Sequence, residues 1–376
     1  MTSPPDACRV LRVYHSSVVR EYRERDRLLR SAHGYDLHLV SPPAWSEGGL
    51  RVTSAPDDAV PMHVVPTRGR EHPILFWYAT RQFRRVLREV RPDIVDLHEE
   101  PYSLSVAAAL HAVEREAPDA KVCVYTAQNI YKRYPPPFRQ LEHRALNRAT
   151  AAYPCSSGAA DVLRSKGFRG QIHVLPLGVS LQRRSPRAFK ADGLRVGFLG
   201  RLESYKGGDF AIRAFAAAAT DLDATLEVVG AGSEREALAT RAAELGVADR
   251  VVFMGAVPQD DALARLATYD AVLVPSVQTR SWKEQFGRIP AQAMEAGSPV
   301  IAFDSGSLRE VVADAGELVP EGDLDALSGR LRAVLSDPRH RADLSKRGRE
   351  RAGGLFSWER VAEGFDVMYR QALDRS

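Results

Sequence analysis

The 376-residue sequence is poor in cysteine and has no long apolar run. Its three cysteines, Cys8, Cys123 and Cys155, form neither a paired framework nor a C-x-x-C spacing, which excludes a zinc site of known pattern and is typical of a reducing compartment. No apolar stretch approaches the ~20 residues that span a bilayer, and the first segment, MTSPPDACRV, lacks the apolar core of a signal peptide. We therefore expect a cytoplasmic protein whose cysteines lie in its core.

Two common nucleotide-binding motifs are also missing. The sequence contains no G-x-x-x-x-G-K-[ST] motif, and the turn after the first predicted strand, RVLRVYHSSVV, has no G-x-G-x-x-G fingerprint. These absences argue against a P-loop protein and against a dehydrogenase.

The net charge of +4 is small for a chain in which 27% of residues are charged. In residues 20–30, REYRERDRLLR, arginines alternate with acids, and Val18, Val19, Tyr22 and Leu29 form an apolar stripe. This pattern predicts an amphipathic helix with a solvated charged face rather than nucleic-acid binding. The surplus charge leaves open a weak attraction to phosphorylated substrates or to anionic lipid, and so a peripheral contact with the inner membrane face.

Apolar runs alternate with helical patterns, which predicts β-α units, and the length predicts two domains. Expected strands cover residues 9–15, 36–40, 93–98 and 121–127 in a first sheet, and 194–200, 225–232, 250–255, 270–276 and 298–304 in a second. We expect an N-terminal domain at 1–178, a linker at 179–193, a C-terminal domain at 194–355, and a terminal helix at 356–376 that packs back towards the N-terminal domain.

The chemistry is expected at the strand ends, because open parallel sheets bind ligands there. Arg201 follows one strand, and Lys206 precedes Gly207-Gly208 and a helical stretch, so both cations can point at an anion near a helix start. Two solvent-facing bases in a turn are the alternative. Further predicted ligand contacts at the strand ends are Gly200, Gly230 and Gly232, which permit close backbone approach, and Gly255 and Val257, whose backbone can pair with a base edge.

The segment SWKEQFGRIPAQAMEAG, residues 281–297, combines an acid, a glycine and an early proline after a strand that ends at Ser276. Pro290 belongs in a first helical turn, so the helix begins near Gly287 to Pro290 and Glu284 lies in the loop ahead of it. Gly287 leaves nearby amides uncovered for a diphosphate or for sugar hydroxyls, and Gln292 faces the same pocket. A helix-capping role for Glu284 and a surface position for Gln292 are the alternatives.

Residues 196–310 resemble the donor-binding half of a retaining glycosyltransferase of the GT-B fold, family 4 type. The resemblance rests on the ordered motifs G-R-L-x-x-x-K-G, V-x-G-x-G, E-x-F-G, x-A-M-x-A-G-x-P-V-I and a final G-x-x-x-E at 306–310. The segments DLHEEPYSL, AQNIYKRYPPPFRQLEHRAL and VLPLGVS are similar to acceptor-domain segments of such enzymes. The implied fold is α/β, with two Rossmann-like, doubly wound parallel-sheet domains facing a central cleft.

The resemblance also implies roles for residues of the C-terminal half. Arg201 and Lys206 match the pair that neutralises the donor diphosphate, and Glu284 matches the first acid of an E-x7-E signature, beside the donor sugar. The backbone segment that touches sugar and phosphate matches Phe286, Gly287 and Arg288. Gln292 replaces the second acid, which binds ribose, and the lost charge-assisted bond costs about 1 kcal/mol. We expect weaker donor binding, which Glu295 offsets in part.

The N-terminal half departs further from the family. Glycines of the first β-α turn are replaced by His15-Ser16-Ser17, and a family histidine is replaced by Gln128-Asn129. For His98 a structural role is favoured over a catalytic one. The run His98-Glu99-Glu100 suggests a metal site or an acid–base pair as an alternative, but adjacent residues point apart, so no metal is expected. The predicted acceptor-side residues are His15, Ser16, Ser17, His98, Glu99, Tyr102, Gln128 and Asn129.

The implied reaction is transfer of a hexose-type sugar from a nucleoside diphosphate, of UDP or GDP type, to an acceptor hydroxyl with retention of configuration. The acceptor is a glycolipid, a polysaccharide or a small natural product, and no resident cofactor is implied. A nucleotide-sugar epimerase or hydrolase on the same fold is one alternative. The other is a catalytically silent nucleotide-sugar-binding protein, which Gln292 favours and which Arg201, Lys206 and Glu284 argue against.

Overall fold

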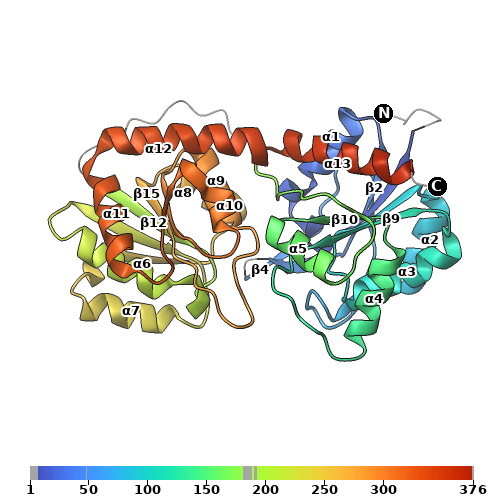
Figure 1. Ribbon diagram of the computed structural model, residues 1–376, viewed down its shortest axis with the longest axis horizontal. Coiled ribbons are helices and arrows are strands. Elements are labelled where there is room, and N and C mark those ends of the chain that lie inside the picture. The colour runs from blue at the N-terminus through green and yellow to red at the C-terminus, as the bar shows by residue number, and fades with distance from the viewer. Residues whose placement is uncertain (1–6, 48, 181–188, 190–192, 375–376) are drawn as a thin grey trace. The chain divides into compact units, whose positions relative to one another are not determined.

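The computed structural model describes residues 7–47, 49–180, 189 and 193–374. The chain divides into two units (Figure 1). The first contains the chain up to Glu47, Arg51–Gly178 and the segment from Trp358 onward, and the second is mainly Val179–Ser357. Most of the linker predicted at 179–193 lies outside the described residues.

The first unit is built on a seven-stranded parallel sheet with the order β11-β10-β9-β8-β1-β2-β5. Its seven strands are short, and the inner ones are apolar runs largely buried on both faces, as expected for a parallel sheet covered by helices. They are β1 (Arg9–Val13), β2 (Asp36–Ser41), β5 (Met62–Val64), β8 (Ile94–Leu97), β9 (Lys121–Thr126), β10 (Ala151–Pro154) and β11 (Gln171–Ile172). Two further pairs of strands are β3 (Ala44–Glu47) with β4 (Leu50–Thr53), and β6 (Thr67–Gly69) with β7 (Phe76–Tyr78).

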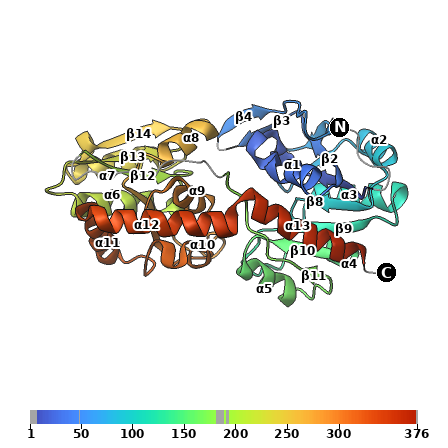
Figure 2. The ribbon, with the colours of Figure 1, turned by 90° about the horizontal axis from the view of Figure 1, so that it is seen from above.

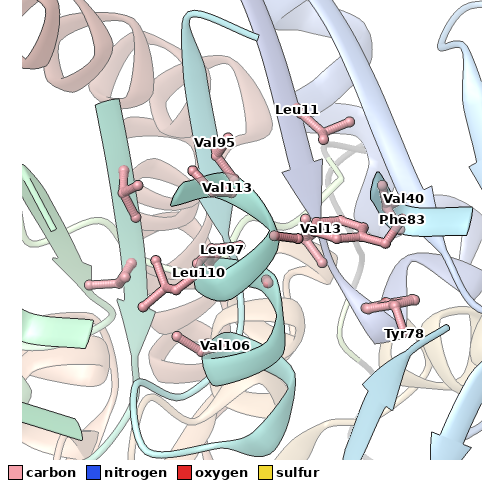
Figure 3. Packing of buried hydrophobic residues seen from close by; sticks show 14 of the residues in the cluster. Leu11, Val13, Val40, Tyr78, Phe83, Val95, Leu97, Val106, Leu110 and Val113 are labelled. Atoms are coloured by element: carbon pink, nitrogen blue, oxygen red, sulfur yellow. The ribbon is translucent and has the colours of Figure 1, made fainter. Parts of the chain in front are cut away.

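Helices cover both faces of this sheet. Alternate strand residues such as Leu11, Val13 and Leu97 pack against α2 (Thr80–Val90), α3 (Leu104–Glu116) and α4 (Phe138–Arg148) (Figure 3). The intervening residues, such as Val10 and Ile94, pack against α1 (Glu24–Ser31) and α13 (Trp358–Leu373). The remaining helix is α5 (Ser157–Ser165). The C-terminal helix α13 buries Trp358, Val361, Phe365 and Tyr369 in this layer.

Charged side chains are buried between this sheet and helix α1. Arg12 Nη1 donates to Asp26 Oδ2 at 2.6 Å, and Arg25 Nη2 donates to Asp96 Oδ2 at 2.8 Å. The four side chains are at most 3% exposed. The prediction that the charged face of residues 20–30 is solvated is therefore wrong for Arg25 and Asp26. Arg12 on β1 and Asp96 on β8 bring opposite charges into this layer, and the two helix residues pair with them.

The second unit holds a six-stranded parallel sheet with the order β14-β13-β12-β15-β16-β17, of which β14, β13 and β12 are seen side by side in Figure 2. Its strands are β12 (Leu194–Leu199), β13 (Ala224–Val229), β14 (Val251–Gly255), β15 (Ala271–Val274), β16 (Val300–Phe303) and β17 (Glu317–Val319). Its helices are α6 (Gly208–Ala218), α7 (Arg235–Glu244), α8 (Gln259–Leu266), α9 (Arg288–Ala296), α10 (Leu308–Val312), α11 (Leu324–Ser336) and α12 (Pro338–Arg351). The predicted class, two Rossmann-like parallel-sheet domains, is confirmed. None of the helices in the described ranges has the length and apolarity needed to cross a bilayer.

Each sheet has one point where the strand order reverses. It lies between β1 and β8 in the first unit and between β12 and β15 in the second. Open α/β sheets bind ligands beyond the carboxyl ends of the strands at such switch points. The loops that follow these four strands carry most of the predicted site residues.

Candidate functional site

Lys206, Ser276 and Glu284 meet at the switch point of the second unit. Lys206 Nζ donates to Glu284 Oε2 at 2.7 Å, and Ser276 Oγ donates to the same oxygen at 2.9 Å. Glu284 is buried, whereas the Lys206 side chain is 21% exposed. Because Lys206 follows β12 and the other two follow β15, the pairing of these two strands brings the loops that carry the three residues to the same edge of the sheet.

Two aromatic rings connect Arg201 to this cluster. Lys206 Nζ lies 4.7 Å from the centroid of the Trp282 ring, and Trp282 packs on Tyr205 with 4.2 Å between ring centroids. The Arg201 guanidinium lies 5.6 Å from the Tyr205 centroid and its side chain is exposed. The alternative prediction, that both residues are solvent-facing bases in a turn, therefore holds for Arg201 but not for Lys206. The sequence reasoning missed Tyr205, which lies inside the G-R-L-x-x-x-K-G motif, and Trp282, which lies two residues before the E-x-F-G motif.

Glycines bring three loops into contact around Glu284. Gly207 has φ +74° and Gly306 has φ +56°. A Cβ at Gly207 would collide with the carbonyl oxygen of Pro275, and one at Gly306 would collide with that of Glu284. The backbone N–H of Ser307 donates to the Glu284 carbonyl at 3.0 Å. The loops after β12, β15 and β16 thus hold the carboxylate in place, and the final G-x-x-x-E motif contributes through its glycine.

The other predicted donor-side glycines have a packing role. A Cβ at Gly230 would collide with the carbonyl oxygen of Gly200, and one at Gly232 would collide with that of Leu202. The Gly255 carbonyl accepts a hydrogen bond from Gly230 N at 2.8 Å. These residues therefore let the loops after β12, β13 and β14 approach one another. Their contact with a ligand stays a prediction, as does that of the half-buried Val257.

Helix α9 starts where the sequence predicts, with Gly287 at its N-cap in a left-handed conformation, φ +81°. Phe286 is buried and packs edge-to-face on Phe356 at 5.6 Å, so its ring anchors the loop in the core. Arg288 is half-buried. Gln292 is only 3% exposed, which excludes a surface amide, and its Nε2 has no hydrogen-bond partner within the described part of the chain.

His15 and Glu99 form a close pair at the switch point of the first unit. His15 Nδ1 lies 2.6 Å from Glu99 Oε2, and the His15 backbone N–H donates to Glu99 Oε1 at 2.8 Å. Burial lowers the pKa of His15, but the attraction and hydrogen bond of Glu99 and the charge of Glu47 outweigh burial and raise this pKa above its usual value. Glu47, which the sequence reasoning missed, also accepts a hydrogen bond from the Ser16 hydroxyl.

Two predicted acceptor-side residues have contacts typical of core positions. His98 stacks on Tyr125 with 4.1 Å between ring centroids and lies 4.2 Å from the Tyr14 ring. The Ser17 hydroxyl donates to the Tyr14 carbonyl at 2.6 Å, which closes its own turn. No group of three metal-ligating side chains occurs among the residues described.

Tyr134 brings two more of the predicted residues together. Gln128 Nε2 donates to Tyr134 Oη at 2.9 Å, and the Tyr102 ring stacks on Tyr134 at 4.0 Å. Asn129 is buried with its Cβ beside the start of α5. Nearby, burial raises the pKa of Glu100 to about 7, although hydrogen bonds from the Ala127 N–H and the Thr126 hydroxyl oppose this shift.

Comparisons with known proteins agree with these motifs. The family model for "Glycosyltransferase Family 4" matches residues 26–183, and the model for "Glycosyl transferases group 1" matches residues 182–351. The MMP alpha-(1->4)-mannosyltransferase of Mycolicibacterium hassiacum is 30% identical over 58% of this chain and 53% of its own length. The D-inositol 3-phosphate glycosyltransferase of Acidothermus cellulolyticus is 33% identical over 54% of this chain and 48% of its own. The chain thus spans about half the length of these relatives.

The fold has close counterparts among solved structures. The structure of Anabaena HepE in complex with UDP aligns with a TM-score of 0.70 at 17% identity, and the match covers 96% of this chain and 100% of the other. The two family models together extend across both units, and the motifs of the second unit occur in the family's order. The chain belongs to the GT-B glycosyltransferases of family 4 type.

Proposed function

We propose that this protein transfers a sugar from a nucleoside diphosphate to an acceptor hydroxyl, with retention of configuration and without a metal ion. The observation that carries the proposal is the Lys206–Glu284–Ser276 cluster at the switch point of the second sheet. The names of the relatives, a mannosyltransferase and an inositol-phosphate glycosyltransferase, support sugar transfer. UDP in the HepE complex supports a nucleoside diphosphate donor of UDP or GDP type.

On the donor side, Lys206 and Arg201 bind the diphosphate. Negative charge grows on the leaving phosphate oxygen as the bond between the sugar and that oxygen breaks, and a cation already in place stabilises this charge. The ammonium of Lys206 has three N–H groups, so it can donate to a phosphate while it remains bonded to Glu284. These fixed cations supply the charge that a divalent metal provides in other transferases.

Gln292 is proposed to bind the ribose of the donor. Its buried Nε2 has no partner among the described residues, and an unpaired buried amide is costly unless a ligand supplies the missing hydrogen bond. A ribose hydroxyl can accept that bond, and with the amide turned by 180° the same hydroxyl donates to the amide oxygen, as it would to a carboxylate. Glu284 contacts the donor sugar through the carboxylate oxygen that is not bonded to Lys206.

On the acceptor side, His15 is proposed to position the attacking hydroxyl. Glu99 holds the ring through Nδ1, which leaves Nε2 for the acceptor. The acceptor oxygen forms the new bond to the sugar while the phosphate departs, and the departing phosphate takes the acceptor proton. In this scheme the protein acts mainly by positioning and by electrostatic stabilisation.

A thermal-shift screen with UDP, GDP, ADP, dTDP and their sugar conjugates tests the proposal. A ligand at 100 times its Kd stabilises the native state by about 2.7 kcal/mol. We expect one nucleoside diphosphate to raise the Tm of the wild-type protein but not that of Lys206→Ala, whereas Lys283→Ala, a nearby lysine outside the cluster, should respond like the wild type. No response to any of these nucleotides would contradict the proposal.

A further inference from the structure

The first unit contains a pocket that the donor and acceptor residues above do not explain. It is formed by the loop after β9, the first turns of α4 and Lys166, which follows α5. The Lys166 side chain is 8% exposed and forms an ion pair with Glu142. Its ammonium lies 4.7 Å from the centroid of the Tyr134 ring and 5.8 Å from that of Tyr131. The inner part of the pocket therefore contains a buried cation near two aromatic rings.

The pocket has a surplus of positive charge. Besides Lys166 it is lined by Lys132, Arg133 and Arg139, and its one carboxylate, Glu142, is already paired with Lys166. Arg133 and Arg139 are exposed and form no ion pair with any residue that the structure describes. An anion bound in the pocket would compensate this unpaired charge.

The other two arginines on α4 have polar partners. Arg144 forms an ion pair with Glu114, and Arg148 Nη2 donates to the backbone carbonyls of Pro118 and Ala120 at 3.0 and 2.8 Å. The unpaired cations are thus gathered at the pocket and are not a general feature of the helix surface. On an ordinary solvated charged face, arginines with and without partners would be mixed along the helix, and those without partners would not be gathered at one pocket.

Direct contacts connect the pocket to the acceptor-side residues. Tyr134 lines the pocket, accepts a hydrogen bond from Gln128 and stacks on Tyr102. Gln128 follows β9, and Tyr102 follows β8 beyond Glu99, the partner of His15. A ligand in the pocket therefore lies next to the residues proposed to hold the acceptor.

We propose that this pocket binds the phosphate group of a phosphorylated acceptor. The proposal rests on the proposed function, because only a transferase needs an acceptor. Guanidinium groups bind phosphate oxygens through paired N–H donors, and the two exposed guanidinium groups of Arg133 and Arg139 match a doubly charged phosphate better than a neutral hydroxyl compound. The exposed ring of Tyr131 suits the apolar face of a sugar or cyclitol ring. The phosphate belongs either to a soluble sugar phosphate or to a lipid headgroup.

Calorimetric titration of the full chain with glycerol 3-phosphate, in saturating UDP so that the donor site is filled, tests the proposal. We expect binding that glycerol does not reproduce, and a loss of affinity of roughly 10-fold in Arg133→Gln and in Arg139→Gln, the scale of one charge-assisted hydrogen bond. Arg144→Gln, on the same helix but paired with Glu114, should bind like the wild type. Both pocket arginines are exposed, so these variants should keep the fold.

A second arm separates the two sources of phosphate. Vesicles containing phosphatidylglycerol are sedimented with the wild type and with Arg139→Gln. If the wild type binds the vesicles, Arg139→Gln does not, and glycerol 3-phosphate does not bind, the phosphate belongs to a lipid headgroup. If glycerol 3-phosphate binds in an Arg139-dependent way and the vesicles do not, the phosphate belongs to a soluble compound. Equal behaviour of the wild type and Arg139→Gln towards both probes would overturn the proposal. Failure of the proposed function would appear separately, because the wild-type protein would then not bind UDP. In that case the titration with glycerol 3-phosphate would be repeated without UDP.

Discussion

Lys206→Ala distinguishes the structural role of this lysine from its role in donor binding. The substitution removes the ammonium that donates to Glu284 Oε2 at 2.7 Å, and the Glu284 side chain is only 10% exposed. Removing one partner of a buried hydrogen bond costs about 1 to 3 kcal/mol. We expect the free energy of unfolding of the second unit to fall by that amount, measured by urea unfolding with tryptophan fluorescence, since Trp282 lies beside the substituted side chain.

Glu284→Gln in the Lys206→Ala background removes the carboxylate charge that has lost its partner. Stability should then recover by about 1 kcal/mol, because a neutral amide is less costly to bury than an unpaired carboxylate. Affinity for UDP, measured by calorimetry, should stay low in the single and the double variant. Transfer should fall by a factor on the order of 100 in both, the scale for losing one preorganised charge. If the double variant binds UDP as tightly as the wild type, Lys206 has only a structural role.

Three further predictions concern other parts of the molecule. Gln292→Glu should lower the apparent donor KM, because a carboxylate binds a ribose hydroxyl more strongly than an amide does; an unchanged or higher KM would contradict the ribose assignment. The interaction with Glu99 raises the pKa of His15. The ion pair of His15 and Glu99 therefore stabilises the fold fully below the unfolded-state pKa of about 6.5, and this stabilisation is lost as pH rises through the higher folded-state pKa. The difference in urea stability between the wild type and Glu99→Gln should therefore shrink with rising pH, and a constant difference would count against the ion pair. Asp96→Asn should destabilise the first unit by about 3 to 5 kcal/mol, because Arg25 loses a buried anionic partner; a loss below 1 kcal/mol in urea unfolding would show that the buried network tolerates the change.

The sequence predicts most of the central strands because each is an apolar run followed by a turn or a helical pattern. It misses β5, β10 and β11 of the first sheet and β17 of the second, none of which is longer than four residues. The Lys206–Glu284 cluster is within reach of sequence reasoning, since residues after neighbouring parallel strands meet at one edge of a sheet. The pairing of His15 with Glu99 is not, because the two residues are 84 positions apart and meet only because β1 lies next to β8. The burial of Arg25 beside Asp96 depends on the same strand order.

The central claim is that Lys206 and the loop at Gly287 bind a diphosphate from which a sugar departs. A crystal structure of the protein soaked with its preferred nucleoside diphosphate tests this claim most directly. We expect the diphosphate to contact the Lys206 ammonium and the backbone amides at the start of α9, with the ribose beside Gln292. A nucleotide bound elsewhere in the second unit, or a site at Lys206 that stays empty at saturating ligand, would contradict the account.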